Sequence, residues 1–190
     1  MDYGLDLYAP QTNVDKDGRR VMVAWLRMPE AVKEDSERGT WNGMMCTPRM
    51  MEVQNGHIYF RMHTEADKYL SKEVQNRKDV DYDRPFRVQT TLKEGDVLDI
   101  GGYRIYVEED CVKADRSRVF GNRKNYRMVS STPQLKGSYG LDIVVDKNLI
   151  EIFVNNGEYV ISNVVYNLQR ELTGPIEKIL AGWDDENEKK

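Results

Sequence analysis

Short runs of alternating apolar and polar residues fill most of the chain, and pairs of turn-forming residues separate them. Asp17-Gly18, Asn55-Gly56, Gly101-Gly102 and Asn156-Gly157 each stand between two such runs. Asn, Asp and Gly adopt the positive φ values that tight hairpin turns require. The pattern therefore predicts an all-β protein built from antiparallel hairpins. The predicted strands cover residues 19–25, 50–53, 57–62, 96–100, 103–107, 150–154 and 158–161.

The strands of the second half of the chain have the alternation of a β-sandwich. Every second residue is apolar in 141–145 and in 150–154, and residues 146–148 form a turn between them. Arg104 and Tyr106 alternate with apolar neighbours, which predicts one wet face for their strand. We expect two packed sheets with a shared apolar core.

Few segments depart from the strand pattern. Residues 65–72 are compatible with a short helical turn. Residues 28–39 are charged, with a proline near the start and a glycine at the end, and predict a loop. The charged tail at 184–190 is expected to fray.

Composition narrows the class of protein. Of 190 residues, 39% are hydrophobic and 32% charged, which is typical of a folded globular chain, and the net charge is −4. The negative net charge argues against a nucleic-acid partner. No apolar run approaches the roughly 18 residues of a membrane span. The first residues show no basic stretch followed by an apolar run, so we expect no secretory signal within this sequence. Cys46 and Cys111 lack metal-ligand spacing, so we expect no metal and two reduced thiols, which favours the cytoplasm.

The first residues hold a candidate catalytic pair. Asp2 and Asp6 lie four apart around Gly4, and in an extended strand they would point to the same face. Glycoside hydrolysis uses two carboxylates across the scissile bond. Carboxylates at a strand end are also common as turn caps or surface charges, so both interpretations stay open at this point.

Four ordered motifs carry a family resemblance. Residues 2–11, 18–25, 41–44 and 48–51 closely resemble the last propeller strands of glycoside hydrolase family 32, the invertases, sucrose-6-phosphate hydrolases and fructanases. In that family these strands follow the catalytic residues, which occupy Asn-Asp-Pro-type, Arg-Asp-Pro and Glu-Cys motifs. This sequence contains none of the three. The resemblance therefore implies a C-terminal portion of a retaining β-fructofuranosidase-type enzyme, with no cofactor and with no catalytic residue in this chain, so that the chain alone is inactive.

The resemblance implies three substrate-binding residues. Tyr8 and Trp25 match positions that lie near the sugar-binding funnel in the family, although Leu7 replaces the usual Phe and Ala24 the more common Gly. Asp6 is implied to make polar contacts near the substrate or to neighbouring catalytic groups. Aromatic faces stack on sugar rings, and a Tyr hydroxyl can donate a hydrogen bond. Core packing is the alternative for Tyr8 and Trp25.

Two further residues have expected structural roles. Arg49 is expected to tie the last propeller strand to the sandwich by charge-assisted hydrogen bonds. Glu151, inside an apolar strand, is expected in a salt bridge or at an edge and not in catalysis.

The later motifs resemble the family's C-terminal sandwich. They are residues 141–146 and 150–157. We predict a propeller remnant at 1–51 and a sandwich domain at 52–190, packed rigidly because no flexible linker separates them. The implied partners are a fructose-containing saccharide in the intact enzyme and the N-terminal propeller part, and exposed propeller edges make a homo-oligomer possible. The alternative function is a non-enzymatic β-sandwich module for carbohydrate binding or protein interaction.

Overall fold

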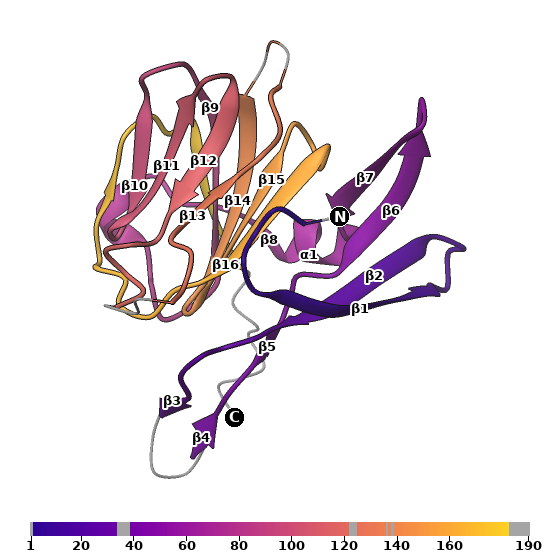
Figure 1. The fold of residues 1–190 in the computed structure, drawn as a ribbon, viewed down its shortest axis with the longest axis horizontal. Helices are drawn as coiled ribbons and strands as arrows, with labels where there is room; N and C mark the ends of the chain where they lie inside the picture. Colours follow the sequence, from indigo (N-terminus) through magenta and orange to yellow (C-terminus); the bar gives the residue numbers. More distant parts are fainter. Residues whose placement is uncertain (1, 34–38, 122–124, 136, 138, 183–190) are drawn as a thin grey trace.

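The computed structural model describes residues 2–33, 39–121, 125–135, 137 and 139–182, and its chain is almost entirely β-structure (Figure 1). The four predicted turns each join a pair of antiparallel strands, which confirms the hairpin prediction. Asn55 has φ 52° and Asn156 has φ 57°, so these residues adopt the conformation for which the turns select them.

The N-terminal strands form one sheet, called here the first sheet, in the order β1-β2-β6-β7 with β5 added beside β2. It stands beside the rest of the molecule in Figure 1. Its strands are β1 (Leu7–Val14), β2 (Arg20–Leu26), β5 (Met44–Met45), β6 (Arg49–Gln54) and β7 (His57–Met62).

Two further sheets face each other and form the predicted sandwich (Figure 1). The five-stranded sheet has the order β13-β12-β11-β10-β17, and the six-stranded sheet has the order β16-β15-β14-β9-β18-β8. The strands of the first are β10 (Val97–Ile100), β11 (Tyr103–Glu108), β12 (Cys111–Asp115), β13 (Val129–Ser131) and β17 (Leu172–Thr173). Those of the second are β8 (Leu70–Glu73), β9 (Phe86–Leu92), β14 (Tyr139–Asp146), β15 (Leu149–Val154), β16 (Tyr159–Val164) and β18 (Lys178–Gly182).

The six-stranded sheet is covered on both faces at β15 and β16. Ile150 and Ile152 belong to the core between the two sandwich sheets. Phe153 and Val160 belong to a second apolar cluster, which they share with Met22 and other residues of the first sheet. All six residues of β15 are consequently buried. The first sheet is thus packed against the sandwich by a continuous apolar layer.

The connecting segments differ in detail from the sequence prediction. The helix α1 (Thr64–Tyr69) ends before Lys72, because Leu70 is buried and already pairs with Gly182 as part of β8. The predicted loop at 28–39 is wrong in part, since β3 (Val32–Lys33) pairs with β4 (Thr40–Trp41). Residues 34–38 and the tail predicted to fray lie outside the described residues. A short 3-10 helix, Arg77–Asp79, precedes β9.

The division predicted between residues 51 and 52 stays a prediction. In the structure Met51 lies inside β6, and its cross-strand partner is Phe60 of β7. The first sheet therefore continues to Met62, ten residues beyond the first one assigned to the sandwich. Within the described residues, no helix is long and apolar enough to cross a membrane.

Candidate functional site

Residues 2–6, called here the strap, run along β16 and join the first sheet to the sandwich. The backbone N–H of Tyr3 donates to the carbonyl of Val160 at 2.8 Å. The N–H of Leu5 donates to Oδ1 of Asn163 at 3.0 Å. Between them the backbone of Gly4 lies so close to β16 that a Cβ added there would stand 1.9 Å from the carbonyl oxygen of Ser162. Only glycine fits at this position without moving the strap.

The first carboxylate of the strap belongs to a buried ionic network around Arg49. The Arg49 side chain, from β6, is fully buried and donates from Nη1 to Oδ2 of Asp2 at 2.7 Å and from Nη2 to Oε1 of Glu151 at 2.5 Å. Ser162 Oγ donates to Asp2 Oδ2 at 2.8 Å, and the backbone N–H of Thr47 donates to Glu151 at 2.7 Å. The structure confirms the tie expected of Arg49 and the salt bridge expected of Glu151.

One guanidinium in this network faces two carboxylates. Burial raises the pKa of Asp2, against the opposing attraction of Arg49 and its hydrogen bonds. Burial also disfavours the Arg49 cation, but Glu151 and Asp2 outweigh it and hold the pKa of Arg49 above its usual value. The network therefore places two carboxyl groups and a single guanidinium in a site closed to water.

The second carboxylate of the strap is held by Arg116, which follows β12. Arg116 Nη1 donates to Oδ2 of Asp6 at 2.5 Å, and the backbone N–H of Val164 donates to the same oxygen at 2.8 Å. The guanidinium carbon stands 3.5 Å from the centre of the Phe120 ring. Asp6 is 7% exposed and Arg116 1%. Burial raises the pKa of Asp6, although Arg116 and the Val164 amide oppose it.

Asp2 and Asp6 are therefore separate structural ties and not one pair across an open cleft. Each carboxylate meets its own buried arginine, one from the first sheet and one from the sandwich. A carboxylate held in this way is poorly placed to transfer protons to a bound sugar. Arg116 was not found by sequence reasoning, because no motif surrounds it and its partner lies 110 positions earlier.

Tyr8 and Trp25 form an exposed aromatic pair at one end of the first sheet. They are direct partners across β1 and β2, and their rings meet edge to face with centroids 5.6 Å apart at 86°. Tyr8 is 50% exposed and Trp25 36%. The guanidinium carbon of Arg27 lies 5.0 Å from the Tyr8 ring centre. The structure thus brings together two of the three predicted site residues and leaves the third, Asp6, at the buried interface with the sandwich.

Two backbone features shape the aromatic pair. The β1–β2 register shifts between Tyr8 and Gln11, where Ala9 has φ 49°, and such a bulge redirects neighbouring side chains. Gly43 has φ 130°, and a Cβ there would stand 3.0 Å from the Trp25 ring. The motif at residues 41–44 therefore contributes a glycine that packs directly against the Trp25 ring.

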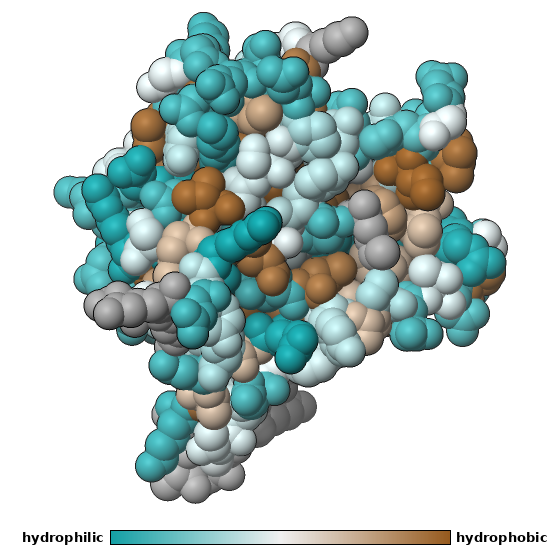
Figure 2. All heavy atoms as spheres, viewed as in Figure 1, coloured by the Kyte–Doolittle hydropathy of each residue, from teal (hydrophilic) through white to brown (hydrophobic). Residues whose placement is uncertain are grey.

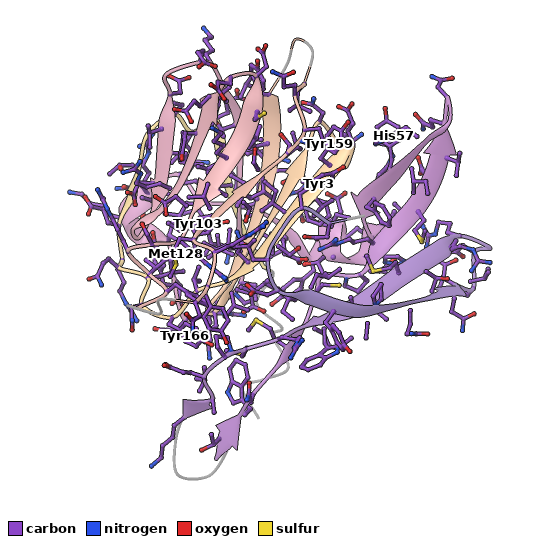
Figure 3. The ribbon with its side chains drawn as sticks, in the orientation of Figure 1. Tyr3, His57, Tyr103, Met128, Tyr159 and Tyr166 are labelled. Atoms are coloured by element: carbon purple, nitrogen blue, oxygen red, sulfur yellow. The ribbon has the colours of Figure 1, made fainter. Side chains whose placement is uncertain are left out.

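A second feature of the first sheet is an apolar groove of about 380 Å³ on the side that faces β16. Figure 3 shows three of its residues, Tyr3, His57 and Tyr159, close together between the sandwich and β7. His57 Nε2 lies 2.8 Å from the Glu158 carbonyl oxygen. Figure 2 shows apolar side chains gathered over β6 and β7, where Val53 and Ile58 are exposed.

Among the described residues, no three His, Cys, Asp or Glu side chains are grouped to hold a metal.

The architecture is similar to that of two solved enzymes that act on sucrose or fructans. A sucrose-6-phosphate hydrolase from Lactobacillus gasseri superposes with a TM-score of 0.74 at 17% identity, over 96% of this chain and 42% of that one. The fructan 1-exohydrolase IIa of Cichorium intybus gives 0.64 at 15% identity, over 95% and 48%. At this identity the likeness establishes the fold: the last strands of a β-propeller followed by a β-sandwich.

Family models and curated relatives agree with this class. The glycosyl hydrolases family 32 N-terminal domain matches residues 1–62, and the glycosyl hydrolases family 32 C terminal matches residues 69–175. The chain belongs to glycosyl hydrolase family 32. It is similar to sucrose-6-phosphate hydrolases of Escherichia coli, with 30% identity over 87% of this chain, and of Vibrio alginolyticus, with 26% over 85%. It spans 38% and 35% of the length of these two relatives.

Proposed function

We propose that this chain is the C-terminal portion of a β-fructofuranosidase-type glycoside hydrolase, in which Tyr8 and Trp25 form part of the rim of the sugar pocket. The observation that carries the proposal is the exposed, perpendicular Tyr8–Trp25 pair. Large aromatic side chains of a sheet are commonly covered by a neighbouring layer, whereas these are exposed and offer ring surface and a hydroxyl to a ligand. The family membership and the names of the relatives support a fructoside substrate, either plain or phosphorylated.

The proposed reaction is the retaining hydrolysis of a terminal fructosyl bond by two carboxylates supplied from outside this chain. Asp2 and Asp6 are unsuited to that role, because their carboxylates hold Arg49 and Arg116. For Asp6 we propose a positioning role. It lies two residues before Tyr8, and its carbonyl accepts a hydrogen bond from the backbone N–H of Arg27 at 2.9 Å.

The binding part of the proposal is tested by titrating the 190-residue chain with sucrose and following tryptophan indole and backbone amide signals by NMR. We expect one indole signal to shift, and Trp25→Ala to remove both that signal and the binding. Val53→Ala is the matched control, since Val53 is 73% exposed on the same sheet but far from the pair. Shifts confined to sandwich residues would instead favour a carbohydrate-binding module and would refute the assignment.

The catalytic part is tested by incubating the chain alone with sucrose and inulin. We expect no turnover above a blank. Turnover that disappears in Asp2→Asn or Asp6→Asn, in protein that remains folded by circular dichroism, would contradict the claim that the catalytic carboxylates lie elsewhere.

We also propose a partner for the apolar groove. Its residues, which include Met22, Met51 and Phe60, would receive the N-terminal part of the propeller in the intact enzyme. Support comes from the family's N-terminal model, which matches residues 1–62. Association of two copies through the same groove is the alternative. Sedimentation velocity distinguishes the two proposals. A chain that stays monomeric across the micromolar range would exclude association through the groove and favour the propeller part as its partner.

A further inference from the structure

Arg27 is an exposed cation held against the aromatic pair. It follows β2 directly, two positions after Trp25, so both side chains lie on one face of the strand. Its guanidinium stands over the Tyr8 ring at 5.0 Å, and its backbone N–H is fixed by the carbonyl of Asp6. A ring beneath a guanidinium holds its plane but leaves the N–H groups at its edge available to a ligand.

Arg27 differs from two other arginines of this region because it has no carboxylate partner within the described part of the chain. Arg19 and Arg61, also in or beside the first sheet, are paired with the carboxylates of Asp15 and Glu52. Among the residues that the structure describes, Arg27 has no ion-pair partner, and its contact is with the Tyr8 ring. A preorganised guanidinium without a carboxylate is suited to bind an anion from solution.

We propose that Arg27, Tyr8 and Trp25 form one subsite for a phosphorylated sugar, in which Arg27 binds the phosphate and the two rings contact the sugar. The inference rests on the proposed function and adds the residue that distinguishes a phosphorylated saccharide from a plain one. The guanidinium fork matches two phosphate oxygens. In a sugar phosphate a single ester oxygen joins the phosphorus to a sugar carbon, so the two groups stay close together. Ring and phosphate contacts can therefore be made by the same small molecule.

The structure also explains why the cation is fixed at this place. The strap anchors Asp6 to Arg116 of the sandwich, and the Asp6 carbonyl anchors the backbone of Arg27. Leu7 and Leu26 are cross-strand partners, so Tyr8 and Arg27 flank this pair on adjacent strands. The backbone positions of Tyr8 and Arg27 are thus fixed by hydrogen bonds and strand pairing, and the Tyr8 ring holds the guanidinium in place.

The test compares the affinities of sucrose, sucrose 6-phosphate and inorganic phosphate for the full 190-residue chain, by the Trp25 indole signal. We expect sucrose 6-phosphate to bind about three- to tenfold more tightly than sucrose, since one exposed charge-assisted contact is added. Arg27→Gln should bring the ratio of the two affinities to about one. Arg20→Gln is the matched control, because Arg20 lies on the same strand and donates to Thr12 at 3.0 Å; it should preserve the ratio.

The outcomes separate the phosphate site at Arg27 from the sugar rim at Tyr8 and Trp25. If sucrose binds and the preference for its phosphate ester is absent, or persists in Arg27→Gln, the phosphate assignment is wrong while the proposed sugar rim stands. If inorganic phosphate shifts the signal as strongly as the sugar phosphate does, the site is a general anion site and the assignment also fails. If neither sugar moves the signal, the proposed rim and the phosphate assignment fail together.

Discussion

Replacing Gly4 by alanine tests the strap most directly. The added Cβ would lie 1.9 Å from the carbonyl oxygen and 2.4 Å from the amide nitrogen of Ser162. Both atoms belong to the backbone of β16, a strand fixed by its pairing with β15, so the strap and not the strand must move. Since the backbone of Gly4 is outside the left-handed region, the substitution acts through this contact alone.

The expected loss follows from the contacts that the strap makes. Moving it weakens the hydrogen bonds of Tyr3 and Leu5 to β16, each worth about 1 kcal/mol. It also separates Asp2 from the buried Arg49, and breaking a buried ion pair costs about 3–5 kcal/mol. Because the strap shifts and does not detach, we expect a total loss of about 3–5 kcal/mol, which lowers Tm by about 6–20 °C in a chain of this size.

The assay is urea unfolding at neutral pH, followed by tryptophan fluorescence. Gly140→Ala is the matched control. Gly140 is also outside the left-handed region, and its added Cβ would meet nothing closer than 3.8 Å. The control should be neutral or slightly stabilising, by up to about 1 kcal/mol. A Gly4→Ala variant within about 1 kcal/mol of the wild type would refute the reasoning, since it would mean that the strap does not lie against β16.

Three other predictions concern charge, thiol reactivity and the aromatic pair. Because burial raises the pKa of Asp2, the folded state binds a proton at this carboxyl group more tightly than the unfolded state does. As pH falls from 7 to about 4, the free energy of unfolding of the wild type should therefore rise relative to that of Asp2→Asn. A fall of the wild-type value relative to the variant, measured by urea titration, would contradict this. Cys46 is buried, and burial raises its pKa to about 11. Ellman's reagent should therefore label Cys111 alone in the native protein and both thiols in urea. Rapid labelling of both thiols in the native protein would mean that Cys46 is open to solvent. Gly43→Ala should push the Trp25 ring from its position and weaken sucrose binding at least threefold in the NMR titration. Gly18→Ala, where φ is also positive but an added Cβ would meet nothing within 4 Å, should weaken it less.

Local rules accounted for most of the strands. Hairpins such as those at Asn55-Gly56 and Asn156-Gly157 could be predicted because turn chemistry and alternation act within a few residues. The short strand β3 was missed because its pairing with β4 depends on two residues in a charged segment. Helix α1 was predicted too long because burial of Leu70 overrides local helix preference.

The site was only partly predictable for a different reason. The aromatic residues Tyr8 and Trp25 could be named from motifs, and their contact follows from one hairpin. The partner of Asp6 could not be named, since Arg116 is brought to it by the packing of the sandwich on the first sheet. Asp2 and Asp6 looked like one acidic pair in sequence, whereas the fold gives each its own counter-charge.

The strap has a consequence for exchanging parts between related enzymes. A sandwich transferred without residues 2–6 and without β6 would carry Arg116 and Glu151 into its new host but leave behind Asp6 and Arg49, their opposite charges. A propeller transferred without the sandwich would in turn leave Arg49 paired with Asp2 but without Glu151. A workable chimera must therefore cut the chain before the strap and not at the connection between the two folds, so that the recombining unit begins upstream of Asp2.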